Sequence, residues 1–272
     1  MNFANILNNI ARTDPEFYER ISPRRRIISN WLPKATLTTL PLVLGGLFNK
    51  AYGKQTGLIE DTLNFALKLE MLESRFYEMA LTKTGLIPAH DLPAIQLISA
   101  NETAHRTFVR NTIVGMGGTP ISEPNFDFTG GNGLGTGPYA DVFINYVTFL
   151  ALSQTFEETA VRAYKGAAPN LMSDNAVLEA ALQVHSVEGR HAAMLRRMRR
   201  LNGHTTAMPW ITQAQSGIES MPAGATWAGE DNTIQAGVTI TALGVSSDAA
   251  TEAFDEPLSQ AAVEAIIDPF VA

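Results

Sequence analysis

The chain has no cysteine among its 272 residues. This absence excludes disulfide bonds, thiolate zinc sites, iron–sulfur clusters and cysteine nucleophiles. Any bound metal ion must therefore be held by carboxylate and imidazole groups. Because proteins of reducing and oxidising compartments can both lack thiols, the absence does not indicate where the protein is found.

The chain also lacks an excess of positive charge and a long hydrophobic run. Its 27 acidic residues outnumber its 20 lysines and arginines, so we expect no nucleic-acid partner. The apolar stretch at residues 37–48 is too short to cross a bilayer, so we expect no stable membrane span. With 45% hydrophobic residues, the chain can bury a full core.

Residues 1–56 are expected to form an N-terminal arm or a degenerate export signal. Three arginines at residues 24–26 precede the moderately apolar residues 37–48, an order that resembles a twin-arginine signal. Prolines and threonines weaken the hydrophobicity of that stretch, which favours an amphipathic arm packed on the protein. We therefore expect either export, for example to a periplasm, or, as the alternative, a cytoplasmic location.

Four segments show the three- and four-residue spacing of apolar side chains that indicates amphipathic helices. They span about residues 59–81, 92–114, 140–166 and 174–201. Short turns within the first and second pairs predict two antiparallel hairpins. A long polar connection at about residues 119–139 is the crossover that a bundle of two hairpins requires.

These features predict an all-α fold, with an antiparallel four-helix bundle at residues 57–202. Beyond it the composition changes to alanine, glycine, threonine and serine. We expect residues 203–272 to form an irregular C-terminal extension packed on the bundle. Residues 238–243 are predicted to form a short strand and residues 259–271 a short helix.

The two predicted hairpins repeat one another. Each carries a glutamate on its first helix and Glu-x-x-His on its second, and residues three apart on a helix can face the same point. The first-helix positions recur after 87 residues and the second-helix positions after 86. The six predicted metal ligands are Glu70, Glu102, His105, Glu157, Glu188 and His191.

This ligand set predicts a pair of metal ions in the bundle core. Four carboxylates balance two divalent cations, the two Glu-x-x-His carboxylates can bridge them, and each histidine can cap one. Without metal the buried carboxylates would repel one another, and several would take up protons. We predict two iron ions, with manganese as the alternative, because these ligands admit both.

Further polar side chains lie close to the predicted ligands. Glu73 faces inward but maps to Ala160 in the second half, so we interpret it as an additional candidate metal residue outside the symmetric set, either an extra ligand or a carboxylate that supports the ligands. Tyr77 and Tyr164 are candidate catalytic residues, which could hydrogen-bond a ligand or relay an electron. The alternative is a core tyrosine with a satisfied hydroxyl. Glu158 is expected to face away from the site.

The fourth predicted helix carries two further features. The arginines among residues 196–200 lie in its last turns, where cations complement the helix dipole, and we expect a solvated face rather than a nucleic-acid patch. His185 precedes Glu188 by one turn. It is either a partner of that ligand or an ordinary hydrogen-bonded histidine.

The segments that carry these motifs resemble the ferritin-like domain family that includes plant desiccation-related proteins. The resemblance covers about residues 57–201, and residues 253–258 are similar to that family's C-terminal extension. It implies a ferritin-like bundle, and an export signal is frequent in the family, but fold alone does not determine activity. The matching segments are LEMLESRFY at 69–77, ETAH at 102–105, FEETAV at 156–161, Tyr164, GAAP at 166–169 and HSVEGRH at 185–191.

Three functions are compatible with this sequence. In the first, two irons react with oxygen or peroxide, and the protein oxidises Fe(II) or removes peroxide as an oxidoreductase. In the second, the ions are manganese and the protein is a catalase-like enzyme. In the third, the bundle is a structural or stress-protective protein without redox activity. The partners expected are metal ions and oxygen or peroxide, and a homo-oligomer is an additional hypothesis.

Overall fold

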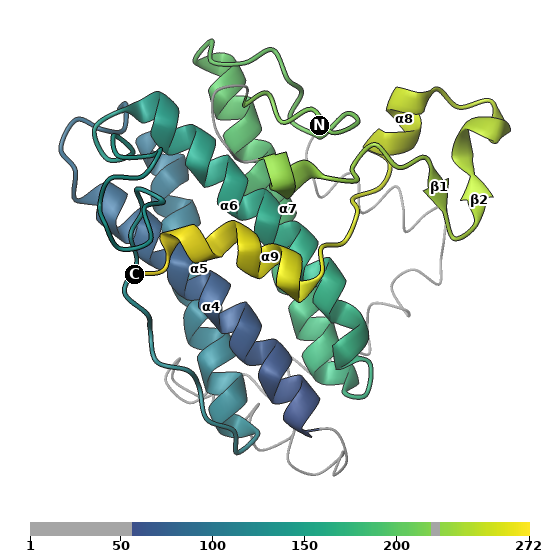
Figure 1. The fold of residues 1–272 in the computed structure, drawn as a ribbon, viewed down its shortest axis with the longest axis horizontal. Coiled ribbons are helices and arrows are strands. Elements are labelled where there is room, and N and C mark those ends of the chain that lie inside the picture. The colour runs from purple at the N-terminus through teal and green to yellow at the C-terminus, as the bar shows by residue number, and fades with distance from the viewer. Residues whose placement is uncertain (1–55, 219–223) are drawn as a thin grey trace, which may run out of the picture. The chain divides into compact units, whose positions relative to one another are not determined.

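The computed structural model describes residues 56–218 and 224–272, and helices make up most of these residues (Figure 1). The N-terminal arm and the export signal predicted from the sequence lie outside the described residues, apart from residue 56. They stay predictions.

Four long helices form the bundle: α4 (Thr56–Leu81), α5 (Leu92–Gly115), α6 (Tyr146–Ala167) and α7 (Asn175–Leu201). Helix α4 packs along α5, and α6 packs along α7, so the chain forms two helical hairpins. The hairpins meet where α4 contacts α6 (Figure 1). The predicted all-α bundle of two hairpins is therefore confirmed.

The start of the third helix differs from the prediction. Helix α6 begins at Tyr146, whereas the sequence predicted a start near Ala140. Asn145 is the reason, because its backbone is extended and its side chain accepts a hydrogen bond from the backbone N–H of Val147 at 3.0 Å. The residues before it form turns instead, such as the one in which Asn145 donates its backbone N–H to the carbonyl of Asp141.

The C-terminal extension consists of short elements. The predicted strand at residues 238–243 is wrong over most of its length, because only Val238 and Thr239 pair and Gly244 then ends a 3-10 turn in the left-handed conformation. The predicted terminal helix is shorter than expected, because a 3-10 turn that contains Pro269 follows it. The elements are η1 (Ala168–Leu171), η2 (Gly224–Trp227), β1 (Ile234–Gln235), β2 (Val238–Thr239), η3 (Ile240–Leu243), α8 (Ser247–Glu252), α9 (Gln260–Ile267) and η4 (Asp268–Phe270).

The end of the chain is tied to the crossover and to the core. Phe126 and Val271 form an isolated antiparallel bridge, and Asp127 donates its backbone N–H to the carbonyl of Phe270 at 2.8 Å. The ring of Phe270 also packs edge-on against Phe156 of α6, with centroids 4.9 Å apart. The end of the extension therefore packs on the crossover and on α6 of the bundle.

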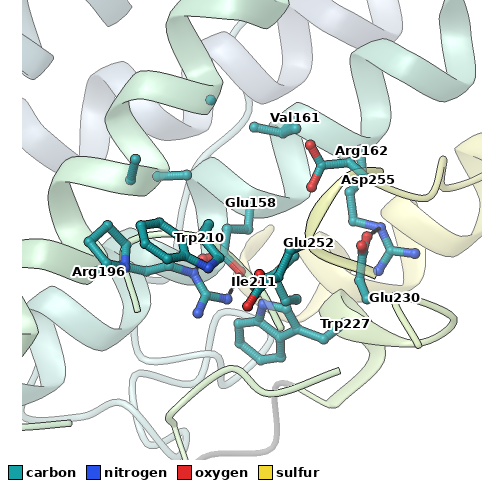
Figure 2. Close-up of a pocket in the computed structure, with 14 residues that line it drawn as sticks. Glu158, Val161, Arg162, Arg196, Trp210, Ile211, Trp227, Glu230, Glu252 and Asp255 are labelled. Atoms are coloured by element: carbon teal, nitrogen blue, oxygen red, sulfur yellow. Dashed lines mark hydrogen bonds and ion pairs between the residues drawn. The ribbon is translucent and has the colours of Figure 1, made fainter. Parts of the chain in front are cut away.

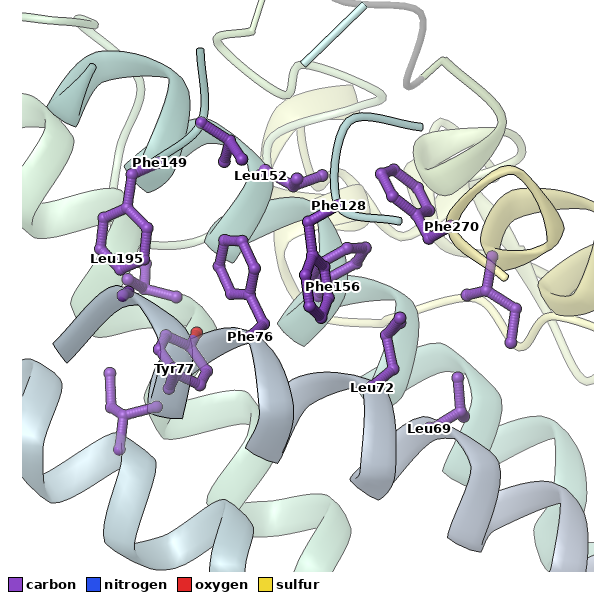
Figure 3. Close-up of a cluster of buried hydrophobic side chains, with 14 of the residues drawn as sticks. Leu69, Leu72, Phe76, Tyr77, Phe128, Phe149, Leu152, Phe156, Leu195 and Phe270 are labelled. Carbon is purple, nitrogen blue, oxygen red and sulfur yellow. The ribbon is translucent and has the colours of Figure 1, made fainter. Parts of the chain in front are cut away.

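The largest apolar cluster centres on Phe76 of α4 (Figure 3). Its ring is fully buried and lies 5.2 to 5.3 Å from the rings of Phe128, Phe149 and Phe156. These aromatic side chains come from α4, the crossover and α6. Packing among them therefore holds both hairpins and the crossover in one core.

A second apolar cluster occupies the other end of the bundle. Met71 of α4, Val109 of α5 and Val184 of α7 belong to it. Along α5 and α7 a short polar stretch, which carries the two Glu-x-x-His pairs, separates the residues of the second cluster from those of the first. On α4 residues of the two clusters alternate, and Glu70 lies between Leu69 of the first cluster and Met71 of the second. Apolar side chains therefore enclose the polar centre.

No helix among the described residues is both long and apolar enough to cross a membrane.

We predict that Phe76→Ala lowers the free energy of unfolding by about 3–5 kcal/mol, because it leaves a cavity among several aromatic rings. Urea unfolding followed by circular dichroism measures the change. The control is Leu97→Ala on α5, whose side chain is exposed and whose loss should change stability by less than about 0.5 kcal/mol. Equal effects of the two substitutions would contradict this description of the core.

Candidate metal centre

The bundle helices direct the predicted ligands into one buried layer. Helices α4 and α6 contribute one glutamate each, Glu70 and Glu157, and α5 and α7 contribute one Glu-x-x-His pair each. The four predicted glutamates have no exposed surface. The side chains of His105 and His191 are 12% and 6% exposed, so the histidines are the members of the set nearest to solvent.

These side chains form two overlapping groups that could each hold a metal ion. Within each group, ligand atoms lie within 4.8 Å of one another. The first group is Glu70, Glu102, His105 and Glu188, and the second is Glu102, Glu157, Glu188 and His191. Because Glu102 and Glu188 belong to both, the arrangement suits two neighbouring ions that share two carboxylates.

Each histidine turns its Nδ1 atom toward carboxylates of other helices. The Nδ1 of His105 lies 2.9 Å from Glu188, and the Nδ1 of His191 lies 2.8 Å from Glu102 and 3.1 Å from Glu157. The centroids of the two imidazole rings are 6.2 Å apart. Both histidines thus contact the same cluster of carboxylates.

Many of these buried atoms have no hydrogen-bond partner within the described residues. They include the Nδ1 of His105 and both side-chain oxygens of Glu102 and Glu188. The close contacts between them lack the direction that a hydrogen bond requires. Leaving buried polar atoms without partners is costly, and a cation would satisfy several of them at once, so this donor set fits a metal.

Without a metal, protons balance the charge of the cluster. Burial raises the pKa of Glu70 to about 7 and that of Glu188 well above its usual value. Burial also acts to raise the pKa of Glu102, but His105 and His191 outweigh it and lower the value to about 2. Burial opposes protonation of His191, yet Glu157 and its neighbours raise the pKa to about 12. A metal ion must therefore displace protons from these side chains.

Two tyrosines hold ligand glutamates across the hairpin interface. Tyr77 of α4 donates its hydroxyl to Glu157 of α6 at 2.6 Å, and Tyr164 of α6 donates in return to Glu70 of α4. Burial and the neighbouring carboxylates raise both tyrosine pKa values well above 10, so both hydroxyls stay donors. The tyrosines thus orient one carboxylate in each half, and a catalytic role for them stays a prediction.

Glu73 lies beside the ligand set but belongs to neither group. It is 1% exposed, and both its oxygens lack a hydrogen-bond partner within the described residues. Burial, together with Glu157 and Glu188, raises its pKa well above the usual value. Burial and the neighbouring carboxylates therefore favour the protonated form of Glu73 in the metal-free protein. Its role beside the site stays a prediction.

Asn101 is a residue that the sequence analysis missed. Its side-chain amide lies 3.1 Å from the Nε2 of His191, on the side of the ring away from the carboxylates. The structure places the amide nitrogen Nδ2 of Asn101 at this contact. A half-turn of the amide brings its oxygen to Nε2, so that Asn101 accepts the ring N–H and leaves the Nδ1 lone pair for a metal. The repeat gives no signal for this contact, because Val187 occupies the corresponding position in the second half.

The comparison with known families agrees with the bundle and its ligand layer. The family model described as Ferritin-like domain matches residues 60–200. The chain belongs to the ferritin-like domain family. A comparison with curated proteins found no match.

Outside the metal layer, the ferritin-like bundle buries a second set of charges. Glu158 faces away from the site, as expected, and accepts a hydrogen bond from the Nη2 of Arg196 at 2.8 Å. Arg199 donates to Gln154 at 2.6 Å. The expectation of a solvated arginine face is wrong for these two arginines, which are 2% and 3% exposed because α6 offers them buried acceptors. His185 belongs to neither metal group.

We predict that Asn101→Ala lowers the metal affinity of the ferritin-like centre by about 10- to 100-fold, because His191 loses the partner that fixes its tautomer. Anaerobic competition against a chromophoric chelator measures the affinity. The control is Asn111→Ala, because Asn111 lies about 15 Å from Asn101 along α5. Unchanged affinity in Asn101→Ala would show that the contact does not support the site.

Removing a ligand of one metal ion should affect the number of bound ions differently from removing a ligand that both ions share. Glu70→Ala is expected to lose one of two bound ions, because Glu70 belongs to one group only, whereas Glu102→Ala should weaken both sites. Elemental analysis after metal loading and desalting gives the number of ions per chain. Glu264→Ala on α9 is the control and should leave the number unchanged. Identical losses in the first two variants would contradict the shared arrangement.

Proposed function

We propose that this ferritin-like protein holds two iron ions and uses them in redox chemistry with oxygen or peroxide. Oxidation of Fe(II) and removal of peroxide are the two reactions of this class that we favour. The observation that carries the proposal is the pair of ligand groups that share Glu102 and Glu188. Two neighbouring ions can exchange two electrons with one oxidant, which a single iron does less readily.

The charge and type of the ligands support iron. Four carboxylates offset the charge of two divalent ions, and the two imidazoles suit iron as well as manganese. Glu70 and His105 would complete the ligand set of one ion, and Glu157 and His191 that of the other. The bound iron pair would supply the redox electrons.

The protein's own side chains orient the ligands and limit access to them. Tyr77 fixes Glu157 by its hydroxyl, and Asn101 fixes His191. The apolar clusters at both ends of the polar layer keep bulk water away from it. A small oxidant would reach the layer most directly beside His105, whose side chain keeps the largest exposed fraction in the set.

Two other functions stay in competition. The same ligand atoms accept manganese, which would make the protein a catalase-like enzyme. A structural or stress-protective role without redox activity would need no metal, because protons can balance the cluster. We further propose export through the twin-arginine-like residues 24–26, with a cytoplasmic location as the alternative, and assembly into a homo-oligomer.

Anaerobic titration with Fe(II), followed by exposure to oxygen, tests the iron proposal. The protein should bind two equivalents and then develop the near-ultraviolet absorption of a coupled diferric pair, faster than Fe(II) oxidises in buffer alone. Glu188→Gln should abolish the fast phase because it removes a shared ligand. Glu264→Gln on the surface helix α9 should retain it.

Other results of metal loading would favour one of the two alternative functions. Rapid peroxide disproportionation by the manganese-loaded protein, with no fast phase for Fe(II), would replace the iron proposal with the catalase-like function. Failure to bind either metal would contradict both and leave the structural role.

A further inference from the structure

A polar cavity lies on the outer side of the α6–α7 hairpin, beneath the C-terminal extension (Figure 2). Its volume of about 180 Å³ leaves room for on the order of ten water-sized groups. Small residues of α7, among them Gly189, Ala192 and Ala193, create this space. Trp210 and Trp227 supply its aromatic lining.

The arginines that line the cavity already donate to acceptors of the protein itself. Arg162 contacts Glu230 at 2.8 Å and donates to the carbonyls of Glu256 and Ala228. Arg196 donates to Glu158 and to the carbonyl of Gln215. Neither guanidinium group is therefore available as the main partner of an anionic ligand.

The carboxylates of the cavity outnumber its arginines. Glu158 and Glu230 are balanced by the two arginines, whereas the carboxylates of Glu252 and Asp255 are exposed at the same cavity and form no ion pair among the described residues. Lys165 donates to the backbone carbonyl of Asp255 and not to its carboxylate. In Figure 2, Glu230 and Asp255 lie on one side and Trp210 on the other. The cavity is thus negatively charged, with aromatic walls.

Glu230 provides an independent sign of a missing partner. The residue is 2% exposed, and its Oε2 atom has no hydrogen-bond partner within the described residues. Burial, only partly offset by Arg162, raises its pKa to about 7. A buried carboxylate oxygen of this kind is an acceptor for which the protein supplies no donor.

We propose that this cavity binds a small organic cation that carries an ammonium group. The ammonium donates to Glu230 while its carbon atoms lie against Trp210 and Trp227, an arrangement in which cation–π attraction adds to the charge. A metal ion fits less well, because the groups of metal-ligating side chains found among the described residues are both in the bundle core. The site is separate from the candidate metal centre and does not depend on its function.

Calorimetry and tryptophan fluorescence with butylammonium and tetramethylammonium chloride test the proposal. The full-length protein is used, with Trp31→Phe in the fluorescence experiment so that the signal comes from Trp210 and Trp227. Both cations should bind saturably at constant ionic strength, with a fluorescence change. Butanol, which has a similar carbon chain and no charge, should bind at least about tenfold more weakly.

Three variants locate the site. Glu230→Gln should weaken butylammonium binding by about tenfold or more, and Asp231→Asn, an exposed neighbour outside the cavity, should change it by less than about twofold. Gly189→Leu should abolish binding by filling the cavity. It keeps the helix intact, because leucine favours helix more than glycine does and a Cβ at Gly189 meets no atom within 4 Å.

Several results would overturn the proposal. They are the absence of saturable ammonium binding, equal binding of butanol, preferential binding of acetate, or unchanged binding in Gly189→Leu. If Glu230→Gln fails to fold, Gly189→Leu still decides the outcome. Unfolding midpoints and the metal content of each variant separate loss of this site from damage to the bundle.

Discussion

The burial of four carboxylates in one small volume is the constraint on which the rest of the structure depends. Glutamates from α4, α5, α6 and α7 meet with no exposed surface, and their mutual repulsion must be balanced by protons or by cations. In the metal-free chain, burial raises the pKa of Glu70 and Glu188, which favours balance by protons. A pair of divalent ions would supply the same balance and also occupy the unpartnered oxygens.

The scaffold keeps this unfavourable layer in place by surrounding it with favourable contacts. The aromatic cluster around Phe76 lies at one end of the layer and a second apolar cluster at the other. Tyr77 and Tyr164 link the two hairpins through hydrogen bonds to ligand glutamates. Outside this core, Arg196 and Glu158 form a buried pair at the cavity under the extension.

Much of the bundle could be predicted from sequence because its signals are local. Helical periodicity and the repeated Glu-x-x-His spacing depend on residues three or four apart, and they were enough to place six ligands in one layer. The features that were missed depend on distant contacts. Asn101 meets His191 only after the hairpins associate, and Arg196 is buried by an extension whose path has no periodic signal. The early start predicted for α6 failed because the side chain of Asn145 caps the helix.

Anomalous diffraction from iron-loaded crystals tests the central claim most directly. The account predicts two peaks about 3.5–4 Å apart. One should lie beside Glu70 and His105 and the other beside Glu157 and His191, with Glu102 touching both. A single peak, or iron bound only to surface carboxylates and none in the bundle core, would contradict the account.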